Sequence, residues 1–123
     1  MDEAVAHLKE TLKIAPDDVY AQANLAWVLA TSPDASLRDG TKAVELAKKL
    51  IERLGHANDA NAIEGLEILA AGYAETGRFS EAIETAQQAL QLAIAQNNVA
   101  LTKSLQSNIA NYRRNLPLRD PGH

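Results

Sequence analysis

Apolar residues recur at helical spacing along almost the whole chain, and short polar breaks divide this pattern into six segments. Within each segment, aliphatic residues and alanines fall three or four positions apart, which is typical of amphipathic helices. The predicted helices cover residues 2–15, 19–31, 39–54, 60–76, 81–96 and 99–115. No segment shows the alternation of a strand, and the connections are short. The pattern therefore predicts an all-α, antiparallel stack of helical hairpins.

The first two breaks carry residues that end one helix and begin the next. Pro16 cannot continue a helix, and Asp17 or Asp18 can cap the following helix with a side-chain oxygen. The turn formers of residues 32–36 end the second helix. Leu37 is the apolar residue of that loop, and we expect it to pack inward.

The later breaks rely on glycine and asparagine. Gly55 is a plausible residue to follow the third helix, and Gly77 closes the fourth. Ser80 is expected to stand just before the fifth helix. Asn97 and Asn98 form a weaker break before the last helix. Prolines mark the irregular tail, residues 117–123.

The same helix–turn–helix unit recurs along the chain. Ala4, Ala43 and Ala82 begin similar stretches, and successive members are 39 residues apart. The stretch of residues 66–92 is the most regular hairpin. Insertions in two loops account for the difference from a basic unit of about 34 residues. Because each hairpin has two apolar faces and buries only one against itself, we expect the hairpins to stack.

These features resemble the tetratricopeptide repeat family, whose pattern is W-x2-L-G-x2-Y followed by A-x3-F and a proline. Residues 73–92, YAETGRFSEAIETAQQALQL, resemble its consensus almost throughout. Residues 25–50 resemble a loop-extended repeat found near the C-terminal ends of bacterial arrays, and the last helix resembles a solvating cap. The matching positions are Leu66, Leu69, Ala70, Tyr73, Ala82, Ala86 and Ala89, with Leu25, Ala26, Ala43, Ala47 and Leu50 in the earlier hairpin.

The resemblance implies a single tetratricopeptide-like superhelical domain of about six helices over residues 1–116. Its parts are a half repeat (1–16), a loop-extended repeat (17–55), a consensus-like repeat (60–96) and a C-terminal capping helix (98–116). In this family the first helix of each repeat lines a concave groove that binds a peptide. By position, the implied lining residues are Tyr20, Ala23, Asn24, Trp27, Thr31, Glu64, Glu67, Ile68, Ala71 and Glu75. Asn24 matches an asparagine that bonds the backbone of the bound peptide, since an amide both donates and accepts.

Three of these residues, Glu64, Glu67 and Glu75, predict an acidic strip along the fourth helix. A solvated helix surface is the simpler interpretation, and one wall of a peptide groove is the functional one. Some chaperone-binding members of the family grip a terminal carboxylate with basic residues. The corresponding positions here are Glu64 and Ile68, so this clamp is excluded. An acidic groove favours a basic or neutral segment of a partner protein.

Two questions stay open at this point. Trp27, the single tryptophan, is either an anchor in the groove or a residue packed under the insertion of residues 33–37. The first helix lacks the neighbour that would precede it in a longer array, so another molecule or a further part of a longer protein would cover its outer side. A self-associating homodimeric scaffold, joined through the first or last helix, is therefore an alternative. An accessory C-terminal array of a larger enzyme, such as a glycosyltransferase, is another.

Composition and motifs argue against other classes of function. The chain of 123 residues has no cysteine, and its formal charge of -4 argues against nucleic acid or an anionic membrane as partner. No apolar run approaches the ~20 residues of a membrane span, and the acidic N-terminus does not resemble a secretory signal, so a cytoplasmic location is the default expectation. His7, His56 and His123 have no metal-site spacing, and no nucleotide-binding or nucleophile motif occurs. We therefore expect no enzyme activity, metal or cofactor, but a protein–protein interaction module.

Overall fold

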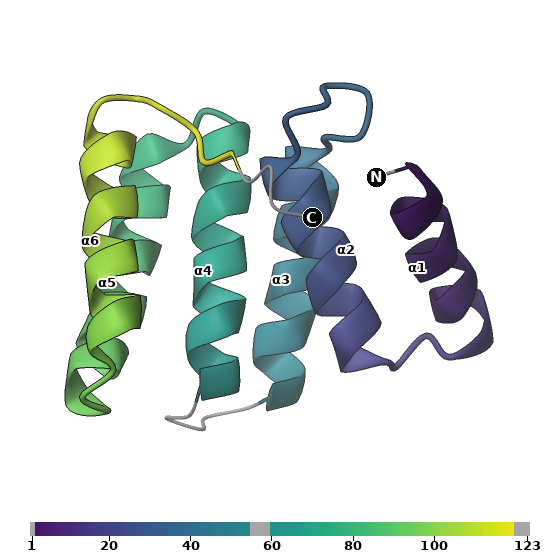
Figure 1. Ribbon diagram of the computed structural model, residues 1–123, viewed down its shortest axis with the longest axis horizontal. Helices are drawn as coiled ribbons and strands as arrows, with labels where there is room; N and C mark the ends of the chain where they lie inside the picture. The colour runs from purple at the N-terminus through teal and green to yellow at the C-terminus, as the bar shows by residue number, and fades with distance from the viewer. Residues whose placement is uncertain (1, 55–59, 120–123) are drawn as a thin grey trace.

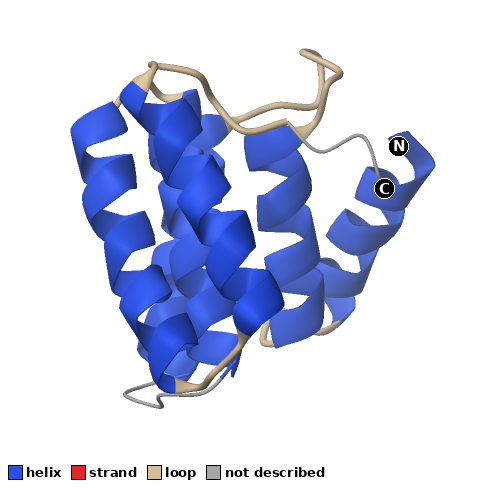
Figure 2. Cartoon of the chain, turned by 60° about the vertical axis from the view of Figure 1, so that its left-hand side comes forward, coloured by secondary structure: helices blue, strands red, loops and turns tan. Residues whose placement is uncertain are grey.

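The computed structural model describes residues 2–54 and 60–119, which form six α-helices and contain no strand (Figure 2). The helices are α1 (Asp2–Ile14), α2 (Val19–Thr31), α3 (Gly40–Leu54), α4 (Ala60–Glu75), α5 (Phe79–Ala95) and α6 (Val99–Arg113). The prediction of an all-α stack is confirmed. The expected helix end at Gly55 lies outside the described residues.

Consecutive helices run antiparallel and pack side by side from α1 to α6 (Figure 1). In addition, α2 packs directly against α4, although α3 lies between them in the sequence. In the view of Figure 1, α2 lies in front of α3 and α6 lies in front of α5. The helices thus form two layers, and α2 and α4 are neighbours in the same layer.

Aspartates stand directly before two of the helices, α2 and α3. Asp18 is the N-cap of α2, and its Oδ1 accepts hydrogen bonds from Tyr20 N at 3.0 Å and Ala21 N at 3.1 Å. Asp39 precedes α3, and its Oδ1 accepts from Lys42 N at 3.1 Å. Of the two predicted capping residues before α2, Asp18 is therefore the one that caps.

Left-handed residues end the last three helices. Gly77, Asn97 and Asn115 have φ angles of 81°, 56° and 60°. After each of them, a backbone N–H bonds to a carbonyl five residues back, which is the Schellman arrangement. These bonds join Arg78 N to Tyr73 O at 2.8 Å, Asn98 N to Ala93 O at 3.0 Å and Leu116 N to Asn111 O at 3.0 Å. The predicted ends at Gly77 and Asn97 are confirmed.

The start of α5 differs from the prediction. The helix begins at Phe79, two residues early, so Ser80 lies in its first turn and does not cap it. Arg78 is the N-cap but makes no side-chain capping bond, and its Nε donates instead to Glu81 Oε1 at 2.7 Å. Only residues 76–78 separate α4 from α5, and Gly77 among them is left-handed.

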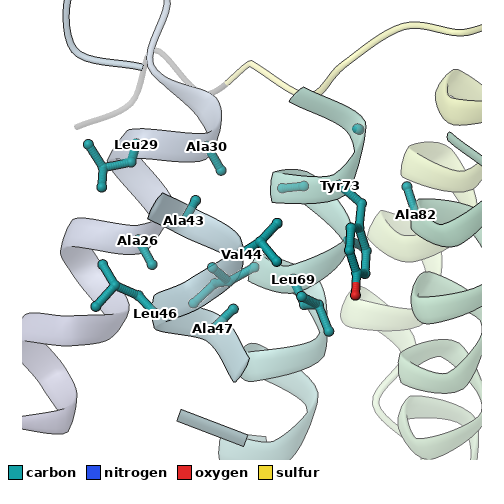
Figure 3. Close-up of a cluster of buried hydrophobic side chains, with 14 of the residues drawn as sticks. Ala26, Leu29, Ala30, Ala43, Val44, Leu46, Ala47, Leu69, Tyr73 and Ala82 are labelled. Atoms are coloured by element: carbon teal, nitrogen blue, oxygen red, sulfur yellow. The ribbon is translucent and has the colours of Figure 1, made fainter. Parts of the chain in front are cut away.

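Small residues occupy the places where helices cross. Ala26, Ala43, Ala70 and Ala82 are at most 1% exposed, and they let the helix backbones approach closely (Figure 3). The ring of Tyr73 lies beside α4 on the side of Ala82 (Figure 3), and the Arg78 guanidinium lies 4.6 Å from its centroid. A second cluster joins α4, α5 and α6 through Ile63, Ala89, Ala93 and Leu105.

The insertion between α2 and α3 is a closed loop. Asp39 N donates to Leu29 O at 2.8 Å, which ties the end of the loop back to α2. The Arg38 guanidinium crosses the loop and donates to Ser32 O at 2.9 Å. Leu37 is half-buried and packs inward, as predicted. It contacts the main core, which is the buried cluster that includes Leu25, Leu29, Val44 and Leu69. The loop therefore covers the C-terminal end of α2.

Candidate functional site

A small, open pocket of about 40 Å³ lies between α2, α3 and α4. Leu50 and Ile68 form its apolar floor, since they are only 2% and 1% exposed. Tyr20 is 77% exposed and Glu64 is also exposed, so these two side chains form its rim. The residues that line the pocket are Val19, Tyr20, Ala23, Leu50, Glu64, Gly65 and Ile68.

Two of the residues that line the pocket are small. Gly65 has no side chain, although a glycine inside a helix costs about 1 kcal/mol relative to alanine. A Cβ at this position would lie 3.0 Å from Cγ1 of Ile51. Ala23 contributes only a methyl group from α2. Glycine at position 65 therefore lets α4 approach Ile51 of α3 closely beside the pocket.

Four of the ten residues assigned to the groove line this pocket. They are Tyr20, Ala23, Glu64 and Ile68. The assignment missed three others, which are Val19, Leu50 and Gly65. An interior glycine in an otherwise strong helix was the available signal for Gly65. The sequence does not distinguish Val19 and Leu50 from core residues, because their spacing fits the helical core equally well.

Two further residues of the assignment continue the same side of α2. Asn24 is exposed, and Trp27 is half-buried and packs against the main core. Tyr20 and Asn24 are four residues apart, and Trp27 follows after three more, so successive members are neighbours on one side of the helix. They extend the rim of the pocket along α2.

Two assigned residues lie in the core instead of on the surface. Thr31 is 1% exposed, and its hydroxyl donates to Trp27 O at 2.6 Å. Ala71 is fully buried. Thr31 is the last residue of α2, and α4 packs against α2, α3 and α5 and so buries a wide face. The expectation that these side chains line a surface groove is therefore wrong.

Glu75, at the end of α4, is already paired within the chain. Nη2 of Arg119 donates to its Oε1 at 2.6 Å, and Nε of Arg38 lies 3.3 Å from the same oxygen. The Glu75 side chain is only 14% exposed. Because two guanidinium groups neutralise one carboxylate, Glu75 adds no free negative charge to the surface. The predicted acidic strip does not extend to this end of α4.

Glu67 lies at a half-buried position between the two ends of the strip. Burial, and secondly the charge of Glu64, raise its pKa to about 7. Burial and the charge of Glu67 together raise the pKa of the Tyr112 phenol on α6. Near neutral pH Glu67 is therefore only partly ionised, and Glu64 carries most of the negative charge beside the pocket.

The described residues contain no group of three or more acidic, histidine or cysteine side chains that could hold a metal ion. His7 is exposed on α1, while His56 and His123 lie outside the described ranges. None of the helices from α1 to α6 is long and apolar enough to cross a bilayer.

Comparison of the chain with protein-family models, with curated proteins and with solved structures finds no match in any of the three. The resemblance to tetratricopeptide repeats therefore depends on the residues of this chain.

Proposed function

We propose that this chain is a non-catalytic interaction module of the tetratricopeptide type, which binds a segment of another protein along α2 and α4. The observation that carries the proposal is the open pocket with the Leu50–Ile68 floor and the Tyr20–Glu64 rim. An apolar floor accepts an aliphatic side chain, and an exposed tyrosine covers it at low entropic cost. The carboxylate at the rim gives the bound segment its direction.

The negative charges beside the pocket limit the kind of partner segment that can bind there. Glu75 is neutralised by Arg38 and Arg119, and Glu67 is only partly ionised near neutral pH. Glu64 is therefore the main negative group at the pocket. This arrangement favours one basic residue next to an apolar residue, in place of a long basic stretch. Asn24, further along α2, can donate to and accept from the backbone of such a segment.

A random-peptide display selection on the purified chain tests this proposal. We expect the enriched peptides to share an aliphatic residue beside lysine or arginine. Their affinity should fall at least about tenfold in Tyr20→Ala and in Glu64→Lys, because each change removes one part of the rim. Binding can be measured by isothermal titration calorimetry.

The matched control is Glu84→Lys, which makes the same charge reversal at an exposed position of α5. Circular dichroism would check that all variants keep the helical fold. The proposal is wrong if enriched peptides bind Tyr20→Ala and Glu64→Lys as tightly as the original chain. It is also wrong if Glu84→Lys weakens binding as much as Glu64→Lys does.

A second candidate is self-association through the ends of the stack. Ile14 at the end of α1 is 81% exposed, and Val99 at the start of α6 is 64% exposed. Exposed aliphatic residues at both ends would be covered in a symmetric dimer. Multi-angle light scattering tests this candidate directly. A monomer mass that stays constant over a wide concentration range would remove it.

A further inference from the structure

The chain after α6 turns back onto the molecule. Asn115 adopts a left-handed conformation, and Leu116 N donates to Asn111 O at 3.0 Å, which fixes the direction of the turn. Figure 1 shows the segment that follows crossing from the end of α6 to the upper end of α4. Residues 117–119 are each half-buried. A helix cap thus directs this tail across the layer that contains α4.

Two side chains hold the tail in place. Leu118 packs against the main hydrophobic core. Arg119 donates from Nη2 to Glu75 Oε1 at 2.6 Å, and from Nη1 to the carbonyl of Leu118 at 2.9 Å. The second bond aligns the guanidinium with the backbone, so the Leu118–Arg119 pair contacts α4 as one unit. Apolar burial and a charge-assisted hydrogen bond act together here.

The tail lies on the same helix as the pocket. Ile68 lines the pocket, and Glu75 follows it by two turns of α4, so both lie toward one side of this helix. A segment bound at the pocket and running along α4 toward its C-terminal end would reach Glu75. That position already holds Arg119.

The pocket offers a bound segment the same chemistry as the tail site, which is the surface of α4 that holds Leu118 and Arg119. The pocket has an apolar floor beside the Glu64 carboxylate, and the tail site has apolar surface beside the Glu75 carboxylate. At the tail site the occupant is visible: a leucine followed directly by an arginine. The chain therefore carries an example of the kind of segment that its own surface accepts.

We propose that residues 116–119 are an internal occupant of the α4 end of the binding face, and that the partner is a segment containing an aliphatic residue followed by arginine, which displaces them. The proposal rests on the binding function assigned above and adds the class of partner and its regulation. When the partner binds, its arginine takes the place of Arg119 on Glu75. Release of the tail is then coupled to binding.

The contact is small enough to exchange. It consists of one half-buried leucine and one ion pair, but the tail is tethered, so its effective concentration at the site is high. A partner must compete with the tethered tail, and its apparent affinity falls by the fraction of molecules in which the site is open. Variants that release the tail should therefore bind the same partner more tightly.

The test uses the full chain and a synthetic probe. The probe is the acetylated, amidated pentapeptide of residues 115–119, Asn-Leu-Pro-Leu-Arg, titrated into the 15N-labelled protein and followed by NMR. In Arg119→Glu we expect the probe to shift the backbone amides of residues 72–76, with an affinity about tenfold above that of the original chain. The double variant Leu118→Ser with Arg119→Ser should behave in the same way, since it removes both contacts without reversing a charge.

The control protein is Arg114→Glu, which reverses an exposed charge at the end of α6. It should bind the probe as weakly as the original chain does. The control probe ends in glutamate and should shift nothing. The proposal is overturned if the probe binds the original chain and the released variants equally, or if it shifts no amide near Glu75 in either released variant.

The result also separates this proposal from the function on which it rests. Peptides from the display selection that depend on Tyr20 and Glu64, but bind Arg119→Glu no more tightly than the original chain, would keep the binding face and reject the role of the tail. If the selection yields no peptide but the pentapeptide binds the released variants, the tail site stands and the pocket falls as the primary site.

Discussion

Gly72 of α4 and Val44 of α3 bring these two helices into close contact. A Cβ on Gly72 would lie 2.9 Å from Cγ2 of Val44 and 3.2 Å from its backbone nitrogen. The backbone nitrogen cannot move without shifting α3 as a whole. Glycine is therefore required at this crossing, because it allows the backbones of α3 and α4 to approach each other closely.

Gly72→Ala is expected to destabilise the chain although alanine is the better helix former. The methyl group gains about 1 kcal/mol in helix propensity but overpacks the crossing by about 1–3 kcal/mol, so we expect a net loss of up to about 2 kcal/mol. Urea unfolding followed by circular dichroism measures the difference. Gly65→Ala is the control, because its new Cβ would meet only Cγ1 of Ile51, a side chain that can adjust. Equal losses in the two variants would contradict the explanation.

Gly77 gives a test in which backbone conformation acts alone. Its φ is 81°, and no atom lies within 4 Å of a Cβ built there. Gly77→Ala should therefore cost about 1–2 kcal/mol through the left-handed conformation, without any clash. Gly77→Asn should cost less, because asparagine adopts this conformation at Asn97 and Asn115 in the same chain. Thermal unfolding ranks the three proteins, and an alanine variant as stable as the original would refute the argument.

Arg38 joins the loop after α2 to the end of α4. It donates to Ser32 O at 2.9 Å and to Pro33 O at 3.2 Å, and its Nε lies 3.3 Å from Glu75 Oε1. In Arg38→Ala we expect amide exchange at Leu37 to accelerate about five- to tenfold, which corresponds to roughly 1 kcal/mol of lost local stability. Exchange at Ala86 of α5 should stay the same. Hydrogen exchange by NMR measures both, and acceleration throughout the chain would mean global destabilisation instead.

The sequence predicts those parts of this fold whose signals are local. The bounds of α2, Val19–Thr31, follow directly from Asp18 before it and the turn formers after it. The end of α4 follows from Gly77. Each of these features depends on residues within one turn, so periodicity and capping rules are sufficient. The start of α5 is placed two residues too late, since only residues 76–78 separate α4 from α5.

The candidate site is predicted less completely because it depends on distant contacts. Nothing near Glu75 indicates that Arg119, 44 residues away, neutralises it. Thr31 has the spacing of a surface stripe, but in the folded chain it is only 1% exposed. Gly65 lines a pocket only because α2, α3 and α4 pack against one another. Spacing along a helix gives the side on which a residue lies, and tertiary contacts decide whether that side is open.

The stability of the chain should depend on pH through Glu67. Its pKa is raised from the ordinary value of 4.5 to about 7, mainly by burial and secondly by Glu64. Between these values the folded chain holds a proton that the unfolded chain has lost, so the contribution of Glu67 to stability is greatest below pH 4.5 and falls as the pH rises to about 7. Above that range the loss is complete. Asp34 has the opposite effect. Hydrogen bonds from Ser36 lower its pKa, so its contribution to stability is lost only as the pH falls to strongly acidic values.

Glu67→Gln isolates this effect, because the amide keeps the shape of the side chain and cannot ionise. At about pH 8 the variant should be more stable than the original chain by about 3 kcal/mol at most, and below the ordinary pKa of Glu67 the difference should vanish. Urea unfolding of both proteins across this pH range gives the difference directly. Glu84→Gln, on the exposed surface of α5, is the matched control and should follow the original chain at every pH. A constant difference between Glu67→Gln and the original chain would show that Glu67 does not carry the proton, and a pH-dependent difference in Glu84→Gln would assign the effect to surface charge in general.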